Sequence, residues 1–273
     1  MTDSTHAFQL LPGAASSPVI LHVPHSSRTL PTDVRRGIVL DDRALQRELD
    51  HITDAHTEEI AARASASSGV RPWQFVNRLS RLVIDPERFP DEREEMLAVG
   101  MGAVYTQTTH REELRPLGTD HEPLLERYFR PYAAAMAVAV ADRLSATGRA
   151  IVIDVHSYPT RRLPYELHGG GSRPPICLGT DAFHTPVALL AQARRSFAEF
   201  GGTGLDSPFA GTYVPLEFYG KDPRVSALMI EIRRDVYMEE PGGRAGPGLE
   251  RLGAALAELV GAVSGGPVAR PTG

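Results

Sequence analysis

Three stretches decide the fold of this chain: HVPHSS (residues 22–27), IVIDVHSYP (151–159) and ALMIEIRRDVY (227–237). Each is an apolar run typical of a buried strand, and the runs reach His25, His156 and Glu231, which can bind metals or protons. In an open α/β sheet, ligands bind at the carboxyl ends of the strands. Two imidazoles and a carboxylate at that edge predict a metal-dependent hydrolase.

Strand-like and helical segments alternate along the chain. Strands are predicted at 18–23, 150–155, 175–179 and 227–232, and in the run SRLVID within 73–85; helices are predicted at 41–65 with a break near Asp54, 122–147, 186–200 and 249–263. This alternation predicts an α/β fold, a mixed and mostly parallel sheet with helices on both faces. We expect one domain at residues 18–264, between a flexible N-terminus (1–17) and a flexible tail (265–273).

Composition narrows the class of protein. The net charge of -5 and the pI near 6.1 provide no basic footprint for nucleic acid. The single cysteine, Cys177, cannot form an internal disulfide, and its apolar surroundings in PPICLG predict a buried residue. The N-terminus lacks the pattern of a signal peptide, and the longest apolar run, 132–141, is too short to span a bilayer. We therefore expect a cytoplasmic protein with a small-molecule substrate and no membrane partner, and leave the oligomeric state open.

The metal site needs a third ligand besides His25 and His156. Asp54 in TDAHTEEI is the first candidate, with His56 and Glu58 as nearby competitors. The same Asp54 also fits a helix N-cap or a first-turn charge. His22 is expected to be structural, because adjacent residues of a regular strand point to opposite faces.

Segments in this order resemble the N-formylglutamate amidohydrolase family: VPHSSRTLP, TDAHTEEI, NRLSRLVIDPERFPDE, VGMGAVYT, IDVHSYP, CLGTD, DSPFAGTYV and IEIRRDVYMEE. That family is related to the zinc carboxypeptidases and aspartoacylases, and the resemblance implies their phosphorylase/hydrolase-like α/β fold. It implies Zn²⁺ on His25, Asp54 and His156, and it places Glu231 at the position of the carboxypeptidase catalytic glutamate. Such a glutamate takes a proton from water and returns it to the departing amine.

The chain departs from the related patterns at two places. Arg28 stands where carboxypeptidases have a glutamate three residues after the first histidine, so the carboxylate ligand moves to Asp54. Arg233 replaces the asparagine of the family's EINR. An ion pair of Glu231 with Arg233 or Arg234 is the alternative to a catalytic role, although pairing and catalysis can coexist.

Substrate carboxylates call for arginine, which binds them with two parallel hydrogen bonds. The run DPER resembles the Asp-x-Asn-Arg of aspartoacylases, which favours Arg88 as the substrate clamp with Asp85 orienting it. Weaker candidates for substrate binding are Arg81, Arg78, Asn77 and Arg234, together with Tyr213 in a loop that can cover the site. Structural ion pairs explain Arg78 and Arg81 equally well.

These residues predict a zinc-dependent amidohydrolase acting in deformylation. The expected reaction releases formate and the free amino acid from N-formyl-L-glutamate or a similar N-formyl amino acid, as in histidine catabolism. The alternatives are a deacylase or carboxypeptidase-like hydrolase for another N-acyl amino acid, and a non-catalytic protein that binds metal or acidic ligands. A binder has no need of Glu231. An iron site for oxygen chemistry fits two histidines and a carboxylate, but the resemblance argues against it.

Overall fold

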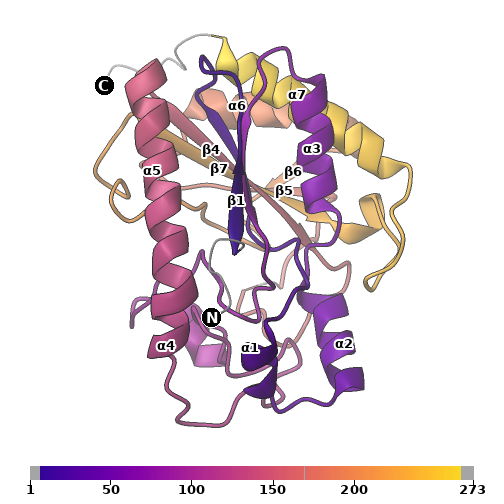
Figure 1. Cartoon of the computed structure of the whole chain (residues 1–273). Helices are drawn as coiled ribbons and strands as arrows, with labels where there is room; N and C mark the ends of the chain where they lie inside the picture. Colours follow the sequence, from indigo (N-terminus) through magenta and orange to yellow (C-terminus); the bar gives the residue numbers. More distant parts are fainter. Residues whose placement is uncertain (1–6, 169, 266–273) are drawn as a thin grey trace.

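The computed structural model describes residues 7–168 and 170–265 (Figure 1). Within them, seven strands form one sheet in the order β1-β3-β2-β4-β7-β5-β6. The strands are β1 (Phe8–Leu11), β2 (Val19–Val23), β3 (Trp73–Asn77), β4 (Ala150–Tyr158), β5 (Ile176–Gly179), β6 (Thr203–Leu205) and β7 (Val225–Arg233). Only the pairs β1 with β3 and β5 with β7 are antiparallel. The predicted mixed, mostly parallel sheet is confirmed.

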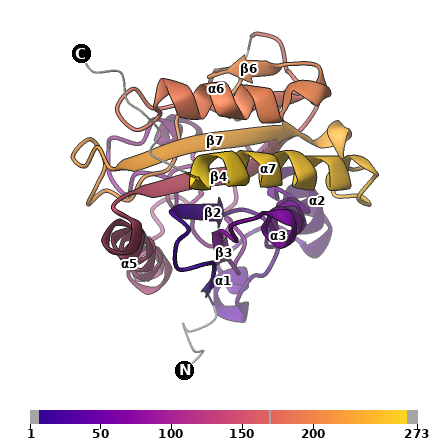
Figure 2. The same cartoon turned by 90° about the horizontal axis from the view of Figure 1, so that it is seen from above.

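Helices cover both faces of this sheet, as predicted. The α-helices are α1 (Thr32–Arg36), α2 (Asp42–Ile52), α3 (Thr57–Ser67), α4 (Glu122–Leu124), α5 (Arg130–Thr147), α6 (Val187–Ser196) and α7 (Gly248–Ser264). Shorter 3-10 or π turns are η2 (Glu95–Val99), η3 (Leu125–Phe129), η4 (Ala198–Phe200) and η5 (Arg234–Val236). Seen from above, α5 lies on one side of the sheet, apart from α3 and α7 (Figure 2). No helix in the described ranges is both long and apolar enough to cross a membrane.

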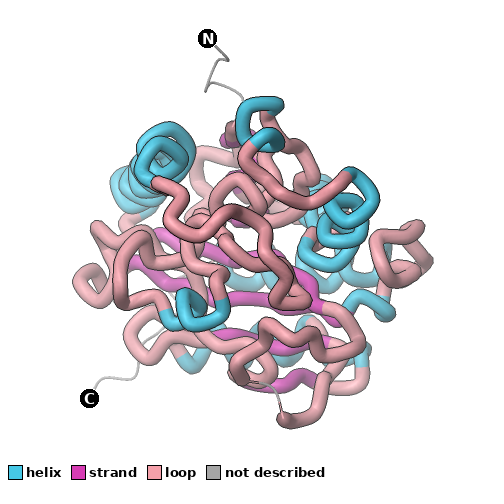
Figure 3. The backbone as a smooth tube through the Cα atoms, turned by 90° about the horizontal axis from the view of Figure 1, so that it is seen from below, coloured by secondary structure: helices cyan, strands magenta, loops and turns pink. Residues whose placement is uncertain are grey.

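The alternation of strand residues explains where the site lies. In β4, Ile151, Ile153 and Val155 join the core formed with α3, α6 and α7. Ala150 and Val152 point the other way and pack against α5. Further along the α5 face, β4 carries Asp154 and His156, and β7 carries Glu231, in place of apolar side chains. Loops cover the lower end of the sheet (Figure 3). The polar site thus lies on the same face of the sheet that packs against α5, where the apolar residues of β4 and β7 give way to polar ones.

Two parts of the predicted secondary structure were wrong. The run SRLVID (80–85) is not a strand: Val83 N donates to Ser80 O at 2.8 Å, so the chain turns there. Its apolar side chains are still buried, because they fill the cores beneath the loops. Strand β1 was not predicted and lies within the N-terminus expected to be flexible, where it pairs with β3. The expected tail falls almost entirely on residues 266–273, outside the described residues.

Candidate active site and metal centre

Three side-chain atoms form a small triangle at the carboxyl edge of the sheet: His25 Nδ1, His156 Nδ1 and Asp54 Oδ2. The two imidazole nitrogens are 3.2 Å apart, and Asp54 Oδ2 lies 3.2 Å from His156 Nδ1 and 3.6 Å from His25 Nδ1. Ligand atoms bound to a tetrahedral ion at about 2.0–2.1 Å would be about 3.3 Å apart. The triangle therefore fits such an ion with one coordination position left open. All three residues are at most 3% exposed.

The surrounding elements hold this triangle in place. His25 follows β2 by two residues, and His156 lies within β4, the parallel neighbour of β2. Asp54 lies between α2 and α3, and its backbone N donates to His25 O at 3.0 Å. That hydrogen bond ties the helical connection to the turn after β2. The carboxylate therefore reaches the histidines although no strand carries it.

The two competitors of Asp54 have other partners. His56 Nε2 lies 3.1 Å from Gly243 O, and its backbone adopts a left-handed conformation (φ 65°) at the start of α3. Glu58 forms an ion pair with Arg78 at 2.7 Å. Of these three candidates, only Asp54 joins the histidines in a group that can hold a metal ion.

A second layer of charged groups surrounds the triangle. His25 Nε2 lies 2.9 Å from Asp85 Oδ1, and His156 Nε2 lies 3.1 Å from Glu87 Oε2. Metal-bound histidines usually donate their other ring N–H to a carboxylate, which fixes the tautomer that ligates the metal. This arrangement leaves both Nδ1 lone pairs to face the same point. Sequence reasoning missed this role of Asp85 and Glu87, although both lie in the DPER run.

The outer carboxylates are stabilised as anions. Burial would raise the pKa of Asp85, but the charge of Arg81 holds it well below its usual range. Burial opposes ionisation of Glu87 as well, and the charge of His156 and its hydrogen bond lower the pKa of Glu87 to about 2. At neutral pH, both carboxylates can therefore accept a hydrogen bond from the Nε2–H group of the neighbouring histidine.

Glu231 stands directly beside the metal-binding triangle. It is the register partner of His156 across β4 and β7, so the spacing of paired strands fixes their separation. Burial raises the pKa of Glu231 to about 7, against the opposing charge of His156. Its Oε2 is buried and has no hydrogen-bond partner among the described residues. The alternative ion pairs of Glu231 are not found among the described residues: Arg233 pairs with Asp235 at 2.7 Å and Arg234 with Asp54 at 3.2 Å.

A cavity of about 230 Å³ joins these groups. Its lining includes the three candidate ligands, Glu231 and three arginines: Arg81, Arg88 and Arg234. The site thus combines a place for a metal ion, a carboxylate whose pKa is raised to about 7 and three arginines beside several carboxylates.

The two arginines of this cavity that flank Asp85 differ in how they are used. Arg81 donates to Asp85 Oδ2 at 2.6 Å and to the Tyr105 hydroxyl at 2.9 Å. Arg88 approaches the same Asp85 oxygen only to 3.4 Å and Glu94 to 3.7 Å, and its Nε makes no hydrogen bond. Asp85 therefore orients Arg81 tightly and Arg88 loosely, which leaves the Arg88 guanidinium available to a ligand.

The remaining sequence candidates lie around the cavity or outside it. Arg234 donates to Asp54 Oδ1 at 3.2 Å and to His51 O at 2.6 Å, so it supports a candidate ligand. Arg78 lies outside the cavity, and Asn77 donates to Pro24 O at 2.9 Å, beside the turn that carries His25. Tyr213 lines a neighbouring cavity.

Comparisons with known proteins identify the family and the fold of the chain. A sequence model of the N-formylglutamate amidohydrolase family matches residues 17–238. The crystal structure of N-formylglutamate amidohydrolase from Ralstonia eutropha JMP134 superposes with a TM-score of 0.77 at 22% identity, covering 95% of this chain and 97% of that one. The structure of gene product Atu2144 from Agrobacterium tumefaciens has a TM-score of 0.64 at 18% identity, covering 96% and 94%. No curated protein sequence matches the chain. Since the family match spans most of its length, this chain belongs to the N-formylglutamate amidohydrolase family.

Proposed function

We propose that the protein is a zinc-dependent amidohydrolase of the cytoplasm that cleaves N-formyl-L-glutamate to formate and glutamate, the type of step that ends a histidine-degradation route. One observation carries the proposal: Glu231 lines the cavity beside a triangle of atoms spaced for a tetrahedral ion, and its buried Oε2 has no hydrogen-bond partner among the described residues. A protein that only binds metal or acidic ligands has no use for a buried carboxylate that titrates near neutrality. Family membership supports the same chemistry.

The residues divide the hydrolysis between them. His25, His156 and Asp54 would hold the metal through Nδ1, Nδ1 and Oδ2. When bound, Zn²⁺ polarises an amide carbonyl and lowers the pKa of a water molecule to about 7. Glu231 accepts a proton from the attacking water while the water oxygen forms a bond to the formyl carbon. It then returns that proton to the nitrogen as the C–N bond breaks, so formate and the free amine leave.

Substrate recognition falls to Arg88. Its guanidinium lines the cavity, and its loosely held N–H groups can bind a carboxylate of the substrate in the two-pronged manner of arginine. Arg81 and Arg234 add positive charge to the same cavity while remaining bound to Asp85 and Asp54. The amino-acid end of the substrate therefore lies toward Arg88, and the formyl group lies at the metal.

Formate release measured over a panel of N-formyl and N-acetyl amino acids tests this proposal. Metal-stripped protein should be inactive, and zinc should restore turnover with N-formylglutamate among the best substrates. An active metal-free protein would remove zinc from the mechanism. A zinc-loaded protein that releases acetate faster than formate would assign it instead to the deacylases of other N-acyl amino acids.

A further inference from the structure

A second cavity lies beside the one that holds the candidate metal site. A neighbouring chamber of about 620 Å³ adjoins the metal cavity, and five residues line both: Glu87, Arg88, Glu95, Ala210 and Met229. Cavities of about 300–1,000 Å³ hold drug-sized ligands. The 230 Å³ metal cavity falls below that range, as suits a small amino-acid derivative, so the chamber is space that N-formylglutamate does not require.

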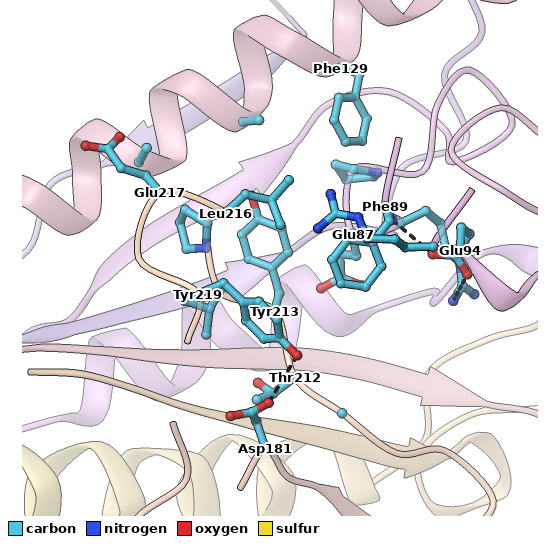
Figure 4. Close-up of a pocket in the computed structure, with 18 of the residues that line it drawn as sticks. Glu87, Phe89, Glu94, Phe129, Asp181, Thr212, Tyr213, Leu216, Glu217 and Tyr219 are labelled. Carbon is cyan, nitrogen blue, oxygen red and sulfur yellow. Dashed lines mark hydrogen bonds and ion pairs between the residues drawn. The ribbon is translucent and has the colours of Figure 1, made fainter. Parts of the chain in front are cut away.

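Apolar and aromatic side chains form part of the walls of this chamber, beside charged groups. The end of η3 and the start of α5 contribute Phe129 and the small side chains of Ala133 and Ala137. Rings and aliphatic groups from the loops close the space opposite them, among them Phe89, Tyr213, Leu216 and Tyr219 (Figure 4). Leu216 is 41% exposed and Tyr219 is 39% exposed, so apolar surface is left uncovered at this wall.

Several charged groups of the chamber have partners within the protein. Glu94 accepts from the backbone N of Phe89 at 2.9 Å and of Met96 at 3.0 Å. Arg93 pairs with Asp91 at 2.7 Å and lies over the Phe89 ring. Asp181 accepts backbone N–H groups of its own turn. These partners hold Glu94, Arg93 and Asp181 at the walls, and the aromatic and aliphatic side chains remain for contact with an incoming group.

A buried polar network fixes the loop that bears Tyr213. Asp154 Oδ2 accepts from Thr212 Oγ1 at 2.8 Å and from Tyr213 N at 2.6 Å, while Asp154 Oδ1 lies 2.7 Å from His22 Nδ1. Asp154 and His22 are fully buried on the sheet, and His22 also lies 2.7 Å from the Tyr132 hydroxyl. His22 lies on the same face of the sheet as Asp154, and its contacts form the wall of the chamber before any ligand arrives.

We propose that this chamber binds an aromatic or large apolar group joined by an amide to the amino-acid end of the substrate. The inference rests on the proposed function, because a carboxylate or carbonyl held at Arg88 has its continuation in the chamber that Arg88 also lines. The preferred substrates are then N-formyl dipeptides with an apolar second residue. Burying such a side chain supplies binding free energy that N-formylglutamate lacks.

The proposal is tested by the kcat/KM for N-formylglutamyl-phenylalanine divided by the kcat/KM for N-formylglutamate. Wild-type protein should favour the dipeptide by about 10-fold or more. Ala137→Phe fills the chamber from α5 and should lower this ratio toward one. Val138→Phe is the matched control, since Val138 is the next residue on the helix, is 60% exposed and does not line the chamber. The control should leave the ratio unchanged.

Several outcomes would overturn the inference. A wild-type ratio near one, or a ratio unmoved by Ala137→Phe, excludes the chamber as a subsite. If Ala137→Phe lowers the melting temperature, Leu216→Asp at the exposed wall replaces it and should lower the ratio in the same way. Preference for a bulky acyl group, as in N-phenylacetylglutamate, would place the occupant on the wrong side of the amide. Absence of all hydrolysis with zinc present would instead reject the proposed function. In that case the subsite is tested by calorimetry, and tighter binding of glutamyl-phenylalanine than of glutamate would still support it.

Discussion

Arg88→Lys should lower kcat/KM for N-formylglutamate while hardly changing the stability of the protein. The exchange keeps the positive charge in the cavity but removes the planar fork that binds a carboxylate through two N–H groups. In the protein itself, Arg88 makes only long contacts, 3.4 Å to Asp85 and 3.7 Å to Glu94. Replacing Arg88 should therefore weaken substrate binding more than it lowers the stability of the fold.

The two free energies involved differ enough to be separated. A hydrogen bond to a charged group contributes about 1.5–3 kcal/mol, which corresponds to a loss of about 10- to 150-fold in kcat/KM. The Arg88 side chain is 26% exposed, and its ion pairs exceed hydrogen-bond distance. Their net contribution to the free energy of unfolding should stay below about 1 kcal/mol.

The assay compares N-formylglutamate with a neutral N-formyl amino-acid amide that has no carboxylate, and records the melting temperature of each variant. The loss for Arg88→Lys should be large with the first substrate and small with the second. Arg81→Lys is the control, because the tight contacts of Arg81 to Asp85 and Tyr105 predict a lower melting temperature and losses on both substrates. If Arg88→Lys behaves like this control, Arg88 has a structural role and does not clamp the substrate.

Three further predictions concern Asp54, Glu231 and Cys177. Asp54→Ala should sharply lower the zinc content measured by elemental analysis, whereas Glu58→Ala should not, and the reverse pattern would reassign the third ligand. Glu231→Gln should reduce turnover by roughly 10²-fold or more at unchanged zinc content, and near-normal turnover would falsify the role as general base. Burial raises the pKa of the Cys177 thiol to about 11, so thiol reagents should react slowly with native protein at pH 8 and rapidly after denaturation. Because the folded pKa exceeds the unfolded one, the associated stability is present below the unfolded pKa and is lost as the pH rises through about 11.

The sequence predicted the strand-borne part of the site because strands impose simple rules. Apolar runs identified β2, β4 and β7, and a parallel sheet brings their carboxyl ends to one edge. His156 and Glu231 proved to be register partners, which no run of letters reveals, since the lateral order of strands depends on long-range pairing. Asp54 lies on no strand, so the residue types alone left it beside His56 and Glu58, and the resemblance to a family favoured it.

The outer layer of the site was not predictable for a related reason. Asp85 and Glu87 are separated from their histidine partners by 60 and 69 residues along the chain. No local sequence pattern around either residue predicts such a contact. The run that ends at Asp85 was predicted as a strand because SRLVID is rich in apolar and β-branched residues. In the folded protein those side chains are buried beneath loops, where burial alone favours them and no ladder forms.

Asp85 connects the two halves of the site. One of its oxygens faces His25 Nε2, and the other receives Arg81 and lies near Arg88. The orientation of a candidate metal ligand and the charge of the cavity wall therefore depend on one fully buried carboxylate. Removing one partner of such a buried charge leaves the others uncompensated, which costs more than the single contact. Under the proposed function, metal binding and carboxylate recognition would therefore both depend on this short loop after β3.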